Sequence, residues 1–66
     1  MRITVNGQTQ DVAPALTVAV LIEHLALSGK RIAIERNGEV VPKSLHASTS
    51  LSAGDKLEII VAVGGG

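Results

Sequence analysis

The chain contains no cysteine and no Phe, Tyr or Trp among its 66 residues. The absence of cysteine excludes disulfides, a thiolate zinc site and any side-chain thiol that could carry sulfur or act as a nucleophile. The absence of aromatic rings removes the stacking platforms that commonly bind single-stranded nucleic acid. If this chain takes part in sulfur chemistry, it must therefore use a group other than a thiol.

Excess charge and long apolar runs are missing as well. Six Lys and Arg balance six Asp and Glu and are spread along the chain, so there is no basic stripe for DNA or RNA. The most apolar stretch, residues 13–22, contains Pro14 and Thr17 and is well below the roughly 20 residues that a membrane helix needs. The first residues form no apolar signal segment. We expect a cytoplasmic protein with no nucleic-acid or membrane partner.

The length allows a single domain, residues 1–66, with one small core, because a domain near this size buries only about 60% of the surface that its unfolded chain exposes. His24 and His46 have no Cys, Asp or Glu at a ligand spacing, so we expect no metal site. The serines of residues 44–52 lack the G-x-S-x-G pattern of a nucleophile elbow. We therefore expect no catalytic residue and no bound cofactor.

Two Asn-Gly pairs, residues 6–7 and 37–38, each follow a run of alternating apolar and polar residues. Asn and Gly readily adopt the positive φ angles of a type I′ turn, which joins the two strands of a hairpin. The pattern predicts one hairpin over residues 2–12 and a second over residues 31–41.

One amphipathic helix is predicted between the hairpins, over residues 18–27. Its apolar residues recur at i, i+3, i+4 and i+7, the spacing that places them on one face. Thr17 is a suitable N-cap, and Ser28-Gly29 should end the helix in a left-handed conformation.

A polar connection over residues 43–52 follows the second hairpin, and we expect Leu45 and Leu51 to hold it against the core. Residues 57–63 then give the strongest strand signal in the chain. Along this strand, Leu57, Ile59 and Val61 should face the core, whereas Glu58, Ile60 and Ala62 should face outward.

This order of elements predicts an α+β fold, the ubiquitin-like β-grasp, in which one helix packs across a mixed sheet of four to five strands. The first and last strands should run parallel at the centre of the sheet, because everything between them serves as a long crossover. The helix should cover the face bearing Ile3, Val5, Ile32, Ile34, Leu57, Ile59 and Val61.

Three glycines, Gly64, Gly65 and Gly66, follow the last strand. On its own such a run is also typical of a frayed terminus. A glycine tail is nevertheless the narrowest thread that a polypeptide makes, and at about 3.3 to 3.6 Å per residue three glycines reach roughly 10 Å. A flexible tail of this kind could deliver the Gly66 carboxylate into another protein's active site. Ile60, Ala62 and Val63, beside the tail, are the predicted partner-binding surface.

The chain resembles the ThiS family of sulfur carriers from thiamine biosynthesis. The resemblance rests on Ile3-Thr4-Val5-Asn6-Gly7, on Thr17-Val18, on residues 37–42 and above all on residues 54–66, GDKLEIIVAVGGG, which are similar to the family pattern G-D-x-[IL]-E-I-V-x-A-V-G-G-G. Many relatives have an aromatic residue within positions 44–47, where this chain has Leu45 and His46.

The resemblance implies that the chain is a protein co-substrate rather than an enzyme. A ThiF-like, E1-like enzyme would use ATP and Mg²⁺ to adenylate the carboxylate of Gly66. Sulfur from a donor such as a cysteine desulfurase would replace AMP, and the resulting thiocarboxylate would donate sulfur to a ThiG-like thiazole synthase.

Three other functions remain open on the sequence. The small subunit of molybdopterin synthase shares the fold, tail and thiocarboxylate, although those proteins are generally longer and commonly contain phenylalanine. A ubiquitin-like protein modifier would form isopeptide bonds through Gly66. A plain interaction module would carry a passive tail.

Overall fold

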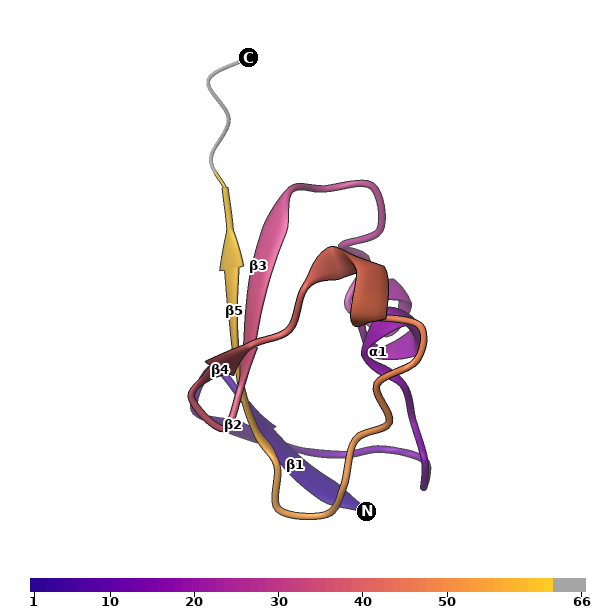
Figure 1. Ribbon diagram of the computed structural model, residues 1–66. Coiled ribbons are helices and arrows are strands. Elements are labelled where there is room, and N and C mark those ends of the chain that lie inside the picture. The colour runs from indigo at the N-terminus through magenta and orange to yellow at the C-terminus, as the bar shows by residue number, and fades with distance from the viewer. Residues whose placement is uncertain (63–66) are drawn as a thin grey trace.

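The computed structural model describes residues 1–62, which form one five-stranded sheet with an α-helix on one side of it (Figure 1). The elements are β1 (Arg2–Val5), β2 (Gln8–Asp11), α1 (Val18–His24), β3 (Ile32–Arg36), β4 (Glu39–Val40), the 3-10 helix η1 (Lys43–Leu45) and β5 (Lys56–Val61).

The strands lie in the order β2-β1-β5-β3-β4. β1 and β5 are parallel, with Thr4 opposite Lys56, and the other pairs are antiparallel. This is the predicted β-grasp, with the first and last strands at the centre of a mixed sheet. β5 therefore has neighbours on both sides, so its backbone is fixed by two ladders.

Both hairpin turns have the predicted geometry. Asn6 and Gly7 adopt φ angles of 49° and 80°, and Asn37 and Gly38 adopt 51° and 87°. Consecutive positive φ angles are the signature of the type I′ turn.

The core is entirely aliphatic and joins one face of the sheet to α1. It consists of Ile3, Val5, Leu16, Val18, Leu21, Ile22, Ile34, Val41, Leu51, Leu57 and Ile59. Val61 lies on the predicted side of the sheet, together with Ile59, but the prediction that α1 covers it was wrong. Its surface is 41% exposed, and Ile32 opposite it is only partly buried. Val61 lines a shallow hollow with Leu25 and Leu27 rather than the core, since α1 ends before it covers this end of β5.

The helix begins as predicted but ends early. The Thr17 hydroxyl accepts a hydrogen bond from the Val20 N–H at 3.3 Å, which caps the first turn. At the other end Ala26, with φ of 58°, takes the left-handed position that we had assigned to Ser28-Gly29. The Leu27 N–H then donates to the Ile22 carbonyl at 3.0 Å, as in a Schellman motif. This early reversal packs Leu27 against the core.

The connection over residues 43–52 is held differently from the prediction. Leu51 is buried as expected, but Leu45 is 48% exposed, and no residue of η1, which it ends, is buried. Backbone hydrogen bonds hold the segment instead. The Val18 N–H donates to the Thr49 carbonyl at 3.0 Å and the Ala19 N–H donates to the His46 carbonyl at 2.9 Å. These bonds satisfy N–H groups that the first turn of α1 cannot pair within the helix.

Candidate functional site

The predicted modified residue, Gly66, and its neighbours Val63, Gly64 and Gly65 lie outside the described residues, so their roles stay predictions. The site that can be described is the base of this segment, the end of β5 together with the surfaces around it. β5 runs toward the end of the sheet that lies opposite the N-terminus (Figure 1).

The Asn6 side chain fixes β5 beyond the point where β1 ends. Its Oδ1 accepts from the Ile59 N–H at 2.7 Å, and its Nδ2 donates to the Ile59 carbonyl at 3.1 Å. The amide thus replaces a backbone peptide and extends the parallel ladder past the turn. On the other side of β5 the Ala62 N–H donates to the Arg31 carbonyl at 2.9 Å. The strand is therefore anchored up to Ala62.

Asp55 fixes the beginning of β5 from a buried position, with 5% of its surface exposed. Its Oδ2 accepts from the Ser52 N–H at 2.8 Å and from Arg36 Nε at 2.7 Å, and its Oδ1 accepts from Asn37 Nδ2 at 3.1 Å. Burial by itself raises the pKa of Asp55, but these hydrogen bonds and the Arg36 charge outweigh it and hold the pKa below its ordinary value.

The Asn37 side chain joins this network to the strand itself. Its Oδ1 accepts a hydrogen bond from the Lys56 N–H at 2.9 Å, while its Nδ2 donates to Asp55 Oδ1. The Asn of each hairpin turn therefore contributes twice, through its φ angle and through side-chain hydrogen bonds to β5. Sequence reasoning recognised only the first contribution.

An apolar patch lies on the face of the sheet away from α1. Ile60 is 61% exposed, and the exposed Ala33 lies opposite it on β3. Ala62 is exposed just beyond the strand, and Val40 on the neighbouring β4 is 69% exposed. The predicted outward positions of Ile60 and Ala62 are thus confirmed. Their role in binding a partner remains a prediction. We call Ile60, Ala33, Val40 and Ala62 the outer patch.

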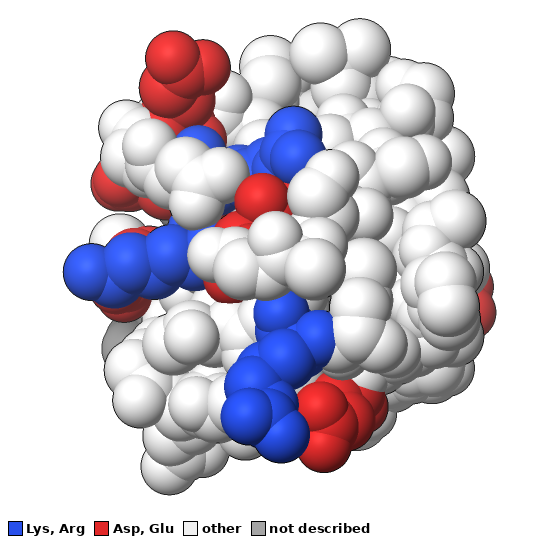
Figure 2. Space-filling model, turned by 90° about the horizontal axis from the view of Figure 1, so that it is seen from below, with Lys and Arg blue, Asp and Glu red and all other residues white. Residues whose placement is uncertain are grey.

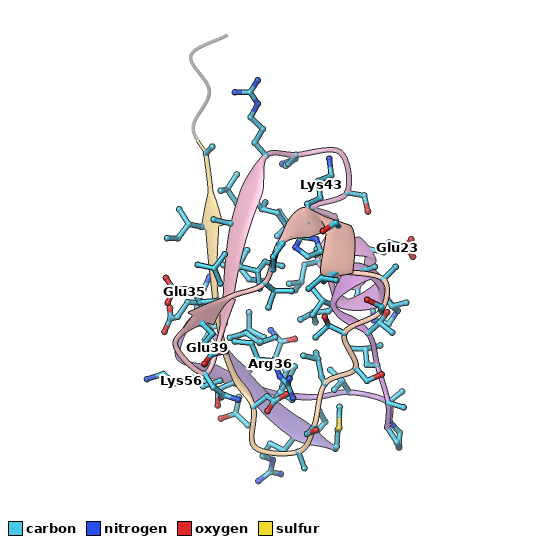
Figure 3. The ribbon with its side chains drawn as sticks, in the orientation of Figure 1. Glu23, Glu35, Arg36, Glu39, Lys43 and Lys56 are labelled. Carbon is cyan, nitrogen blue, oxygen red and sulfur yellow. The ribbon has the colours of Figure 1, made fainter. Side chains whose placement is uncertain are left out.

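Two glutamates interrupt the outer patch. Glu35 and Glu58 lie directly opposite each other on β3 and β5, and Figure 3 shows Glu35 directed away from α1. Neither forms an ion pair within residues 1–62, where the two ion pairs join Arg2 to Asp11 and Arg36 to Asp55. Like charges directly opposite each other destabilise a sheet. Sequence reasoning missed Glu35, because only strand pairing brings it beside Glu58.

The two histidines stay apart from this site. His46 Nε2 lies 3.1 Å from the Val41 carbonyl oxygen, an arrangement in which the ring N–H donates. His24 is exposed in the last turn of α1. Over the described part of the chain, no group of three or more His, Cys, Asp or Glu is placed to hold a metal ion. No helix within residues 1–62 is long and apolar enough to cross a membrane.

Comparison with solved structures supports the fold. The crystal structure of a thiamine biosynthesis protein (ThiS) from Geobacter metallireducens superposes with a TM-score of 0.85 at 33% identity, covering 100% of both chains. An NMR structure of a thiamine biosynthesis protein from the same organism gives a TM-score of 0.81 at 35% identity, covering 100% of this chain and 88% of that one.

Comparison with protein sequences finds relatives of two sizes. A thiazole synthase of Paramagnetospirillum magneticum is 39% identical over 66 residues, but this chain spans only 20% of that protein's length. An uncharacterised protein of Porphyra purpurea, ycf40, is 39% identical over 64 residues, which are 97% of this chain and 90% of that protein.

The ThiS family model matches residues 3–66, and this range includes β5, the outer patch and the three glycines. Because this match covers nearly the whole sequence and the solved structures superpose over the whole chain, the chain belongs to the ThiS family of sulfur carriers.

Proposed function

We propose that the Gly66 carboxylate is adenylated by a ThiF-like enzyme and converted to a thiocarboxylate that supplies sulfur to a thiazole synthase in thiamine biosynthesis. The observation that supports this proposal is the ThiS family match, which extends over residues 3–66 and so includes Gly66. The chain would be a co-substrate, and ATP and Mg²⁺ would be bound by the activating enzyme.

The chemistry needs only the terminal carboxylate of this chain. A carboxylate oxygen attacks the α-phosphate of ATP, which forms an acyl-adenylate and releases pyrophosphate. A sulfur nucleophile supplied by a donor such as a cysteine desulfurase then attacks the acyl carbon, and AMP leaves. If the nucleophile is a persulfide, a thiol must reduce the resulting acyl disulfide to the thiocarboxylate. Glycine suits this position because no Cβ obstructs attack on the carbonyl carbon.

The fold supports this role by fixing the base of the tail. Two ladders and the Asn6 amide hold β5, and Ala62 is bonded to Arg31. From Ala62 the four following residues reach at most about 13 to 14 Å. When an enzyme binds the outer patch, the terminal carboxylate must therefore lie within this distance of Ala62.

We assign the outer patch, together with the predicted Val63, to the partner enzymes. Clustered apolar side chains at the surface are typical of interaction sites, whereas an isolated one is ordinary. A Lys or Arg of the partner would relieve the charge repulsion between the opposed Glu35 and Glu58. Such an ion pair would add specificity to the apolar contact.

Thiazole synthase is the recipient that the comparisons favour. In the Paramagnetospirillum protein of that name, about a fifth of the length resembles this chain. The presence of such a domain within the polypeptide of a thiazole synthase supports functional coupling between sulfur delivery and thiazole formation.

Sulfur loading tests the proposal directly. The purified chain is incubated with the ThiF-like enzyme, ATP and Mg²⁺, and pyrophosphate release is measured. Addition of a cysteine desulfurase and cysteine should change the protein's mass by the replacement of one oxygen with sulfur, and fragmentation should map this change to Gly66.

The control is the chain that lacks Gly65 and Gly66. Its carboxylate is withdrawn by roughly 7 Å, so it should fold normally but gain no sulfur. Sulfur at another position, or on the truncated chain at the same rate, would refute the proposal. Lysine-linked conjugates would instead identify a protein modifier, and sulfur transfer to a molybdopterin precursor but not to thiazole synthase would identify the molybdopterin pathway.

A further inference from the structure

A second surface at the tail-bearing end lies on the helix side of the sheet. It is a pocket of about 290 Å³ where the segment after α1, the start of β3 and η1 meet. Its apolar lining comes from Ile22, Leu27 and Ile32, and its cations are Lys30, Arg31 and Lys43. We call this site the basic pocket.

The charge of the basic pocket contrasts with the neutral chain. Three of the six Lys and Arg line it, and no Asp or Glu does. None of the three takes part in the ion pairs formed within residues 1–62, which use Arg2 and Arg36. At the opposite end of the molecule, seen from below in Figure 2, cationic and anionic groups are interleaved. Among the described residues, the cations of the pocket therefore have no ion-pair partner.

The pocket adjoins the base of the tail without overlapping the outer patch. The Arg31 carbonyl accepts the Ala62 N–H, so the pocket begins where β5 ends. In Figure 3 Lys43 lies on the α1 side of the sheet, whereas Glu35 points to the other side. An enzyme that takes up the tail must approach this end and can contact both surfaces.

We propose that the basic pocket binds an acidic segment of a partner enzyme that carries an apolar side chain among its carboxylates. The apolar side chain covers the aliphatic lining, and the carboxylates pair with Lys30, Arg31 and Lys43. A protein segment fits better than a free phosphate, because a small anion would leave the aliphatic lining in water. The proposal deepens the proposed function, on which it rests, by assigning a second docking surface to the carrier.

The test measures dissociation constants for the ThiF-like enzyme and for thiazole synthase by calorimetry. The pocket variant is Lys30→Glu/Lys43→Glu. The matched control, Arg2→Glu/Lys56→Glu, has the same net charge but changes two exposed cations at the other end of the molecule. Arg2 is next to the N-terminal residue marked in Figure 1, and Lys56 is labelled in Figure 3. Circular dichroism verifies that both variants fold.

We expect the pocket variant to bind at least one enzyme about tenfold or more weakly, and the weakened affinity to lose much of its dependence on salt. The control variant and the charge-preserving Lys30→Arg/Lys43→Arg variant should bind within about twofold of wild type, since neither alters the charge of the pocket. Equal weakening by the pocket and control variants would show that only net charge matters and would overturn the proposal.

Sulfur loading of the wild-type chain separates this proposal from the carrier function. If Gly66 gains sulfur and the pocket variant still binds both enzymes at wild-type affinity, the pocket proposal fails and the carrier function stands. If Gly66 gains no sulfur, both fail. NMR titration with inorganic phosphate is a further check. Saturable shifts at Lys30 and Lys43, combined with unchanged enzyme binding, would identify a small-anion site instead.

Discussion

Replacement of Asp55 by asparagine should destabilise the fold at neutral pH and have little effect in acid. Asp55 accepts three hydrogen bonds, and one of its donors, Asn37, is committed on its other side to the Lys56 N–H. In Asp55→Asn the new amide can place its oxygen toward Ser52 and Arg36. Its NH₂ group then faces the NH₂ of Asn37, so one donor opposes another.

The magnitude follows from the bonds lost. A hydrogen bond to a charged group contributes about 1.5 to 3 kcal/mol, and one such bond is lost outright in the asparagine variant. The Arg36 side chain is 31% exposed, so loss of the ion pair is partly screened by water and adds less than a buried pair would. We expect Asp55→Asn to lower the free energy of unfolding by about 2 to 3 kcal/mol, and Asp55→Ala to lower it by more. Small domains have only about 5 kcal/mol to lose.

The pH dependence has a definite sign. The pKa of Asp55 is lowered from 3.8 by folding, so its contribution is fully present above that value and is lost as pH falls through the folded-state pKa. Urea unfolding at several pH values, followed by far-UV circular dichroism because the chain has no Trp or Tyr, should show the gap between wild type and Asp55→Asn closing in acid. A gap that stays constant from neutral to strongly acidic pH would refute the ionised network.

Three further predictions concern β5 and α1. Ile60→Glu should fold normally but weaken binding to the activating enzyme, whereas Ile59→Glu should unfold the domain, because it buries an unpaired carboxylate. Equal unfolding of both variants in a thermal melt would contradict the assigned faces. Asn6→Gly keeps the turn but removes both side-chain hydrogen bonds to Ile59. It should lower the free energy of unfolding by about 1 to 3 kcal/mol and speed hydrogen exchange at the Ile59 amide. Unchanged exchange would show that Asn6 does not anchor β5. Ala26→Gly removes the backbone strain of an alanine in the left-handed conformation, so it should raise the free energy of unfolding, measured by urea denaturation, by up to about 1 kcal/mol. A loss of stability would show that φ at this position is not strained.

The sequence by itself determined the elements and their order, because the signals that specify them are local. The type I′ turns at Asn6-Gly7 and Asn37-Gly38, the Thr17 cap and the apolar period of α1 all act within a few residues. Those signals were sufficient for the β-grasp topology, and the motif that ends in three glycines was sufficient for the family. The end of α1 was missed because Ala26 takes a conformation that glycine usually supplies.

The tertiary structure alone decided what surrounds the base of the tail. Asn6 reaches Ile59 across 53 positions of sequence, and no local pattern encodes that bond. Glu35 meets Glu58, and Lys43 joins Lys30 and Arg31 around one pocket, only because strand pairing and the course of η1 bring distant segments together. Periodicity shows which side of a strand a residue occupies, whereas its neighbours there depend on register and on which segments pack alongside it.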